Sequence, residues 1–148
     1  MQRIKTKILY IKIPILGFLL AALVAGCHSK DPSPDSVNST FLTSGTWLIN
    51  RVTFNDVDHG SDFIGFTLSF QKTAFSSQNG DPVWPSSGTW KFSNRKATSL
   101  VRDDNLEIEI LTISNTELKL SLQWSKTTYD HNGRVSSIAG KYVFEFSK

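Results

Sequence analysis

The chain has 148 residues, of which 16 are Lys or Arg, 13 are Asp or Glu, and one is Cys. A single cysteine excludes an internal disulfide, and this length leaves room for one ordinary domain behind a short leading segment. The formal charge of +3 is distributed unevenly along the chain, so it indicates a partner only when each segment is considered by itself.

Residues 1–26 have the three parts of an export signal. Residues 1–12 contain four basic side chains and no acidic one, and residues 13–26 carry no charge. The uncharged run is shorter than the about 20 apolar residues that a membrane-spanning helix needs. It ends in small residues and is followed at once by Cys27. We therefore expect residues 1–26 to be a signal peptide.

The end of this segment, "LVAGC", resembles the lipobox of bacterial lipoproteins. In that family the bond before the cysteine is cut and the new N-terminal cysteine is acylated. The resemblance implies that residues 1–26 are removed and that Cys27 is the lipidation site. His28, where an Asp would favour the inner membrane in lipoproteins of Gram-negative type, implies the outer membrane, on its periplasmic face or at the cell surface. The alternative is a plain signal peptide with an incidental cysteine.

Removal of the signal changes the charge balance. Residues 1–26 hold 4 of the 16 basic side chains and none of the 13 acidic ones, so 12 bases and 13 acids remain, a formal charge of −1. The basic excess belongs to the signal, and we expect no nucleic-acid partner.

Residues 27–40 combine Cys27 with a stretch rich in Ser, Pro and Asp that has no periodic apolar pattern. This composition predicts a flexible linker. A single domain is then expected over residues 41–148.

Within this domain, apolar and polar residues alternate with a period of two, as in antiparallel strands that bury one face. The clearest runs are "GFTLSFQK", "NLEIEI", "ELKLSLQW" and "KYVFEFSK", and Asn-Gly pairs at 79–80 and 132–133 predict hairpin turns. No window of 11 residues after the linker has helical spacing. The pattern predicts an all-β antiparallel meander of about seven or eight strands, closed as a barrel or folded as a β-sandwich.

The run that opens the domain, "SGTWLIN", has a Gly45-x-Trp47 motif, and "SGTWKF" repeats Gly-Thr-Trp at 88–90. Gly45-x-Trp47 resembles the lipocalin signature, and the whole pattern looks like that of bacterial lipocalin-like lipoproteins. The resemblance implies a lipocalin-like β-barrel in which Gly45 permits close approach of the chain and Trp47 closes the floor. The β-sandwich remains the alternative.

Two features of the chain qualify this resemblance. The arginine that packs over the tryptophan in lipocalins has no counterpart, since only Lys141 and Lys148 are available near the last strand. The first strand also changes its apolar phase near Asn50-Arg51, which predicts a β-bulge.

The positions expected to face inward are all large. An eight-stranded barrel has an interior only just wide enough for side chains or one small ligand, so we expect a barrel largely filled by its own residues. Any cleft should be small and lie beside residues 55–62 and 81–85. The inward positions are Trp47, Ile49, Phe66, Leu68, Phe70, Trp90, Phe92, Leu106, Ile108, Ile110, Leu118, Leu120, Leu122, Trp124, Tyr142, Phe144 and Phe146.

The loop "NDVDHGSD" alternates Asp56, Asp58 and Asp62 around His59 and Gly60. Carboxylates spaced in this way can gather oxygens around Ca²⁺, but no Glu closes the loop at the twelfth position. We favour the interpretation that these residues serve turn geometry. The histidines have no nucleophile or metal-ligand partner at a recognisable spacing, so we expect no catalytic residues, no cofactor and no enzyme activity.

Trp84 lies between two prolines in "DPVWP", outside the alternating strands. It is either an exposed rim residue that binds a sugar or a partner, or a plug folded over one barrel end. Phe63 is a second candidate rim residue. The sequence thus predicts a lipid-anchored binding protein. The family resemblance implies a small hydrophobic ligand, with docking on an envelope protein or on carbohydrate as alternatives.

Overall fold

The computed structural model describes residues 32–129 and 135–148. Residues 1–26, for which a signal peptide is expected, Cys27 and the Asn-Gly pair at 132–133 lie outside this part of the chain. The described residues include one α-helix, one 3-10 helix and eleven strands. None of the helices in these ranges is both long and apolar enough to cross a membrane.

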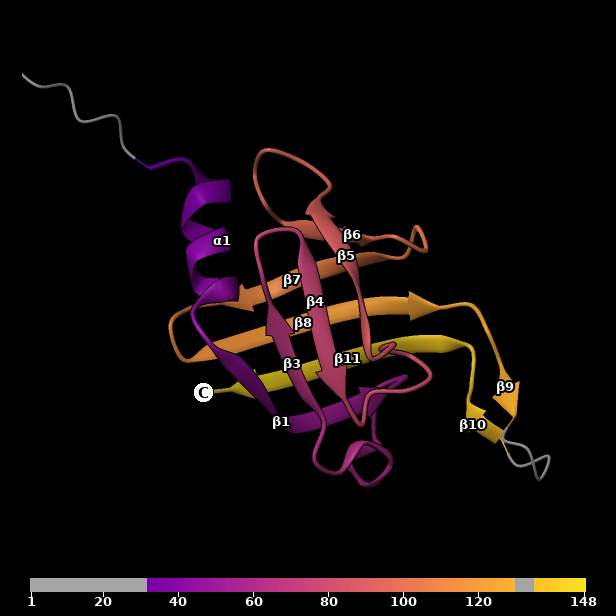
Figure 1. Cartoon of the computed structure of the whole chain (residues 1–148). Helices are drawn as coiled ribbons and strands as arrows, with labels where there is room; N and C mark the ends of the chain where they lie inside the picture. The colour runs from indigo at the N-terminus through magenta and orange to yellow at the C-terminus, as the bar shows by residue number, and fades with distance from the viewer. Residues whose placement is uncertain (1–31, 130–134) are drawn as a thin grey trace, which may run out of the picture. The chain divides into compact units, whose positions relative to one another are not determined.

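Eight of the strands form a closed antiparallel barrel (Figure 1). Each barrel strand pairs with the next barrel strand along the chain, and the first, β1 (Thr46–Phe54), pairs with the last, β11 (Gly140–Ser147), from Leu48 opposite Ser147 to Phe54 opposite Tyr142. This closure confirms the predicted lipocalin-like barrel and shows that the β-sandwich alternative is wrong. The barrel strands are β1 (Thr46–Phe54), β3 (Thr67–Phe70), β4 (Ala74–Gln78), β5 (Ser87–Phe92), β6 (Ser99–Arg102), β7 (Glu107–Ile113), β8 (Glu117–Trp124) and β11 (Gly140–Ser147).

Three short strands and the 3-10 helix lie outside the barrel wall. β2 (Val57–Asp58) extends the pairing of β1, and η1 (Gly60–Phe63) follows it. β9 (Thr128–Tyr129) and β10 (Val135–Ser137) pair with each other and project beside the end of β8 (Figure 1).

The predicted bulge in the first strand is present. The register of β1 against β11 shifts between Ile49 and Arg51, which leaves Asn50 without an opposite residue. Its side-chain oxygen accepts a hydrogen bond from Ser147 Oγ at 3.0 Å. The extra residue explains why Trp47 and Val52 are both buried although five positions separate them.

The prediction of a flexible linker through residue 40 is wrong, because α1 (Pro34–Thr43) begins inside that segment. Pro34 occupies the first turn, where its missing N–H is not needed and its fixed φ suits a helix. Asp35 in the same turn interacts favourably with the helix dipole. A helix of ten residues with one buried side chain produces no apolar stripe that sequence periodicity could detect.

α1 is attached to the barrel near its C-terminal end. Leu42 is fully buried, and Asn38 Nδ2 donates to the Ala97 carbonyl at 3.1 Å. The compact unit therefore begins at Pro32 and not at residue 41.

Because neighbouring strands are antiparallel, successive connections alternate between the two ends of the barrel. We call the end beside α1 the helix end, and Figure 1 shows the other, the loop end, on the side of η1 and β9–β10. The helix end carries the connections 71–73, 93–98 and 114–116, and the loop end carries 55–66, 79–86, 103–106 and the described parts 125–129 and 135–139 of the last connection.

The barrel interior is filled with large side chains, as expected. Phe66 at its centre contacts Phe144 and Phe146 at ring-centroid distances of 5.7 and 5.4 Å. Of the 17 predicted inward residues, Ile49, Phe92, Leu106 and Ile110 are partly buried against this core, and the other 13 are buried.

Candidate functional site

Trp47 closes the helix end of the barrel. Its side chain is fully buried and its Nε1 donates to the Leu42 carbonyl at 3.0 Å. Lys148 Nζ lies 3.7 Å from the Trp47 ring centroid and donates to the Phe41 carbonyl at 3.0 Å. Lys148, one of the two lysines that the sequence offers near the last strand, therefore takes the place of the arginine for which the sequence has no counterpart.

The role expected for Gly45 is not supported by the geometry. A Cβ added at Gly45 would meet the Lys148 side chain at 3.7 Å, which is ordinary van der Waals contact. The backbone there also has no positive φ. Gly45 is therefore not required for close packing of the chain at the barrel floor.

Trp84 is a plug and not a rim residue. It is 0% exposed and packs edge-on against Phe75 with ring centroids 5.7 Å apart. Its loop can fold inward because Gly80 has no side chain: an added Cβ there would lie 2.7 Å from Trp84 Cβ. Phe63 is also buried, with its ring edge-on to Phe144 at 5.2 Å, so the rim role predicted for both residues is wrong.

Arg102 completes this closure of the loop end. Its side chain is 1% exposed, and its guanidinium carbon lies 5.2 Å from the Trp84 ring centroid. Nη1 donates to the Val83 carbonyl at 2.7 Å, and Nη2 and Nε donate to the Asp104 carboxylate at 2.6 and 3.1 Å. These hydrogen bonds from Arg102 lower the pKa of Asp104. We call Trp84 and Arg102 together the loop-end plug.

Sequence reasoning missed Arg102, although a signal was present. Leu100 and Arg102 share the inward phase of β6, and Asp103-Asp104 follows at once. A basic residue on an inward phase, next to acids, indicates a buried ion pair.

The acidic loop is not assembled as a metal site. The Asp58 carboxylate accepts a hydrogen bond from Gly60 N at 2.9 Å, which lowers the pKa of Asp58, and Asp62 pairs with His59 Nδ1 at 2.9 Å. Asp56 has a φ of 67°, as a tight turn requires. In the described ranges, no three carboxylate, imidazole or thiol groups are placed to hold a metal ion together.

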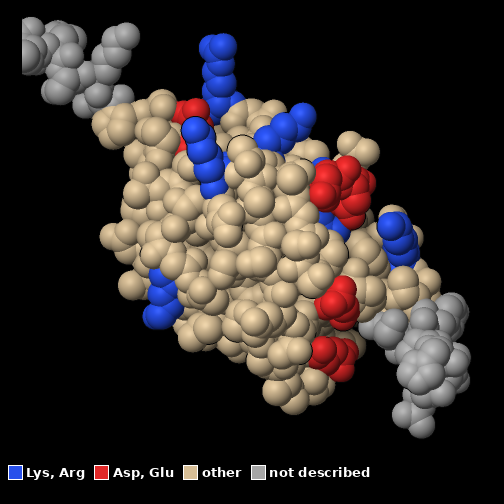
Figure 2. Space-filling view, viewed as in Figure 1, with Lys and Arg blue, Asp and Glu red and all other residues tan. Residues whose placement is uncertain are grey.

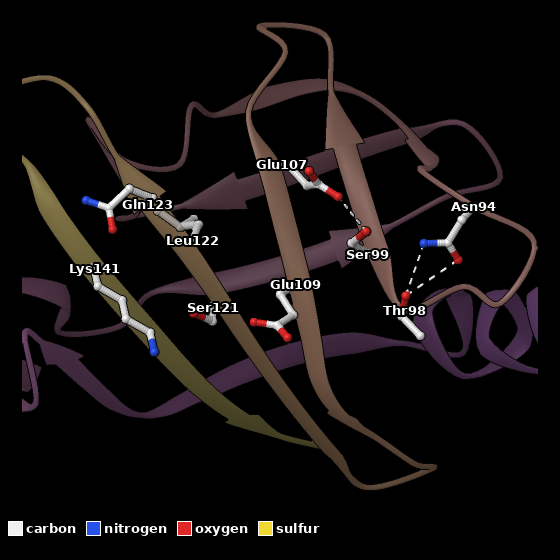
Figure 3. A pocket seen from close by; sticks show the side chains of 9 residues that line it. All are labelled: Asn94, Thr98, Ser99, Glu107, Glu109, Ser121, Leu122, Gln123 and Lys141. Carbon is white, nitrogen blue, oxygen red and sulfur yellow. Dashed lines mark hydrogen bonds between the residues drawn. The ribbon is translucent and has the colours of Figure 1, made fainter.

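A hollow of about 540 Å³ lies on the outer surface of β6, β7, β8 and β11 (Figure 3), and we call it the outer groove. Its floor follows from the strand register, which places Ser99, Glu109 and Ser121 in one row across three strands. The two serines are small and only 7% and 5% exposed, so the longer side chains around them form walls. The lining residues are Asn94, Thr98, Ser99, Glu107, Glu109, Ser121, Leu122, Gln123 and Lys141.

The polar groups of the outer groove combine both charges. Glu107 accepts a hydrogen bond from Ser99 Oγ at 2.8 Å, which holds its carboxylate over the floor. Figure 3 shows Glu109 and Lys141 on either side of Ser121 with their charged ends toward it. The groove therefore offers carboxylate acceptors and an ammonium donor to one ligand. Sequence patterns could not reveal it, because outward polar residues on strands look the same on any solvated face.

No protein-family model matches the chain, and no curated protein matches it.

Proposed function

We propose that this chain is a lipid-anchored outer-membrane lipoprotein whose barrel is a non-catalytic binding module, and that binding takes place on the outside of the barrel. The filled interior is the observation that carries this proposal. Phe66, Trp84 and Phe144 occupy the space in which an open barrel of eight strands would hold a ligand. A protein built to carry a small hydrophobic ligand inside the barrel would need smaller side chains there.

The outer groove favours a protein partner of the cell envelope. Its carboxylates and its lysine match the mixed donors, acceptors and charges of a polypeptide surface, and complementary charges confer specificity on such contacts. None of its nine lining residues is aromatic, so it offers no ring on which a sugar could stack. This chemistry supports envelope-protein docking over carbohydrate binding.

A photo-cross-linking amino acid at Gln123, in the outer groove, is expected to capture one partner in living cells. The same substitution at Ser76, exposed on β4 at the opposite side of the barrel, should capture none. Glu109→Lys should weaken the Gln123 adduct about tenfold, since it replaces a carboxylate of the groove with a cation and so reverses the local charge complementarity. Equal adducts from Gln123 and Ser76, or an adduct unaffected by Glu109→Lys, would contradict the proposal.

Cys27→Ser is expected to leave the precursor uncut and without acyl chains. Cys27 lies outside the described residues, and the support for its lipidation is the intact "LVAGC" that ends the export signal. The intact mass of the purified protein measures both changes, and Ser29→Ala is the control that should still be processed. A Cys27→Ser variant that is cut and remains on the membrane would show that the anchor is elsewhere.

A further inference from the structure

The charges of the described residues divide between the two ends of the barrel. Figure 2 shows Lys and Arg gathered around the helix end and most of the visible acids toward the loop end. The exposed bases at the helix end are Lys72, Lys91, Arg95, Lys96 and Lys148, with Asp35, Glu117 and Glu145 as the nearby acids, the last paired with Lys119. The loop end carries Asp56, Asp58, Asp62, Asp81, Asp103 and Asp104, with Arg51, Arg102, Lys126 and Lys141 on the same half.

A second hollow, of about 340 Å³, lies among these bases at the helix end. It separates α1 from the turn after β3 and from β5. Lys72 and Lys91 are among its lining residues and place two positive charges beside it, and Trp90 and Phe92 contribute apolar surface. The remaining lining residues are Asp35, Ser36, Ser39 and Thr73.

The chemistry of this hollow suits a phosphate ester with an apolar neighbour. Lysine ammonium groups and hydroxyls bind phosphate oxygens, and an apolar wall accepts the carbon atoms attached to them. Asp35 opposes an anion, but its charge is partly offset by that of Arg95. Lys96 adds a further exposed charge at the same end.

If Cys27 is acylated as proposed, the start of α1 holds this end of the barrel close to the lipid. Only residues 28–33 separate Cys27 from Pro34, and six extended residues span at most about 20 Å. The linker expected from sequence, which ran to residue 40, would have allowed a much greater distance. With the short connection, the first turn of α1 stays within that distance of the acylated residue, which favours an orientation with the helix end toward the bilayer.

We infer that the hollow between α1 and β5, with the lysines and arginine around it, binds the phosphate-bearing headgroups of anionic phospholipids in the membrane that holds the acyl chains. Each Lys or Arg close to an anionic surface strengthens association about fivefold. This contact orients the barrel so that the outer groove and the loop end remain open to the envelope partner.

The test uses the mature acylated protein in vesicles of phosphatidylcholine, with or without one-third phosphatidylglycerol. An amine-reactive reagent labels the lysines, and mass spectrometry measures the labelling rate at each one. Lys72, Lys91 and Lys96 should react at least fivefold more slowly in the anionic vesicles, whereas Lys126 and Lys141 at the loop end should not change. Salt at 1 M, where the Debye length is about 3 Å, should remove the protection.

Two double variants test whether the lysines of the hollow are required for the protection, and inorganic phosphate tests whether a soluble anion can replace the lipid. Lys72→Ala/Lys91→Ala should abolish protection of Lys96, and the matched pair Lys126→Ala/Lys141→Ala should retain it. Inorganic phosphate on the protein in neutral vesicles should not protect these lysines; protection by phosphate alone would overturn the assignment to a lipid surface.

The failures of the two proposals can be distinguished. A purified protein whose mass lacks acyl chains would overturn the proposed anchoring, and the tether argument with it. An acylated protein whose helix-end lysines react equally in both kinds of vesicle would overturn headgroup binding alone.

Discussion

Trp84→Ala is expected to lower the free energy of unfolding by about 3–5 kcal/mol, as much as Trp47→Ala, because truncation of a fully buried aromatic side chain leaves a cavity. Both side chains are 0% exposed. Trp84 lies in a loop between two prolines, where sequence alone suggests a small effect, but its ring packs against Phe66 and Phe75 in the core. Denaturant unfolding of both variants measures the two losses.

Trp84→Phe is the informative control. The Trp84 Nε1 donor is buried and has no hydrogen-bond partner among the described residues, so its removal eliminates an unsatisfied group while most of the ring volume is kept. We expect Trp84→Phe to cost less than half as much as Trp84→Ala. A loss below about 1 kcal/mol for Trp84→Ala, the range of surface substitutions, would show that this residue does not close the barrel.

Asp104→Ala is expected to cost about 3 kcal/mol, because it leaves the charged guanidinium of Arg102 buried without its partner. Asp104 is itself 36% exposed, so solvent reaches one side of the pair and keeps the cost at the low end of the range for buried pairs. Asp62→Ala, which breaks the exposed pair with His59, should cost less than about 1 kcal/mol. Equal losses in the two variants would contradict the role of the loop-end plug.

A double variant separates the charge from the packing. Arg102→Met/Asp104→Ala should be more stable than Asp104→Ala alone, since no buried charge remains and Met keeps much of the contact with Trp84. A double variant that is less stable than Asp104→Ala would mean that packing of Arg102, and not its buried charge, dominates the loss of stability.

The ion pair between Arg102 and Asp104 also makes the free energy of unfolding depend on pH. Because Arg102 lowers the pKa of Asp104 from its usual value near 3.8, the unfolded chain takes up this proton at a higher pH than the folded one. The stabilisation by this pair is therefore complete at a pH above the pKa of Asp104 in the unfolded chain, and it is lost as the pH falls through the lowered pKa of Asp104 in the folded protein. Asp104→Asn should remove this part of the pH dependence.

The wall of the barrel could be predicted from sequence because it depends on local pattern. Strict alternation in "NLEIEI" and "ELKLSLQW" specifies which face of each strand is buried, and the phase change at Asn50 marks the bulge. Closure then follows from the need to pair the edges, as β1 and β11 do.

The features that were missed depend on contacts between residues far apart in the chain. Trp84 is buried only because Gly80 lets its loop fold over Phe66. α1 is held by single contacts such as that of Asn38 with Ala97, 59 positions away. The outer groove arises because the register brings small residues into one row, and no single strand shows that in its own sequence.

The most direct test of an interior filled by its own side chains is a titration of the folded protein with fatty acids and with a dye that fluoresces in apolar cavities. We expect no saturable binding, because Phe66 and Phe144 fill the interior and Trp84 closes the loop end over them. Saturable micromolar binding that is lost on Phe70→Trp would place a ligand inside the barrel and contradict binding on its outer face.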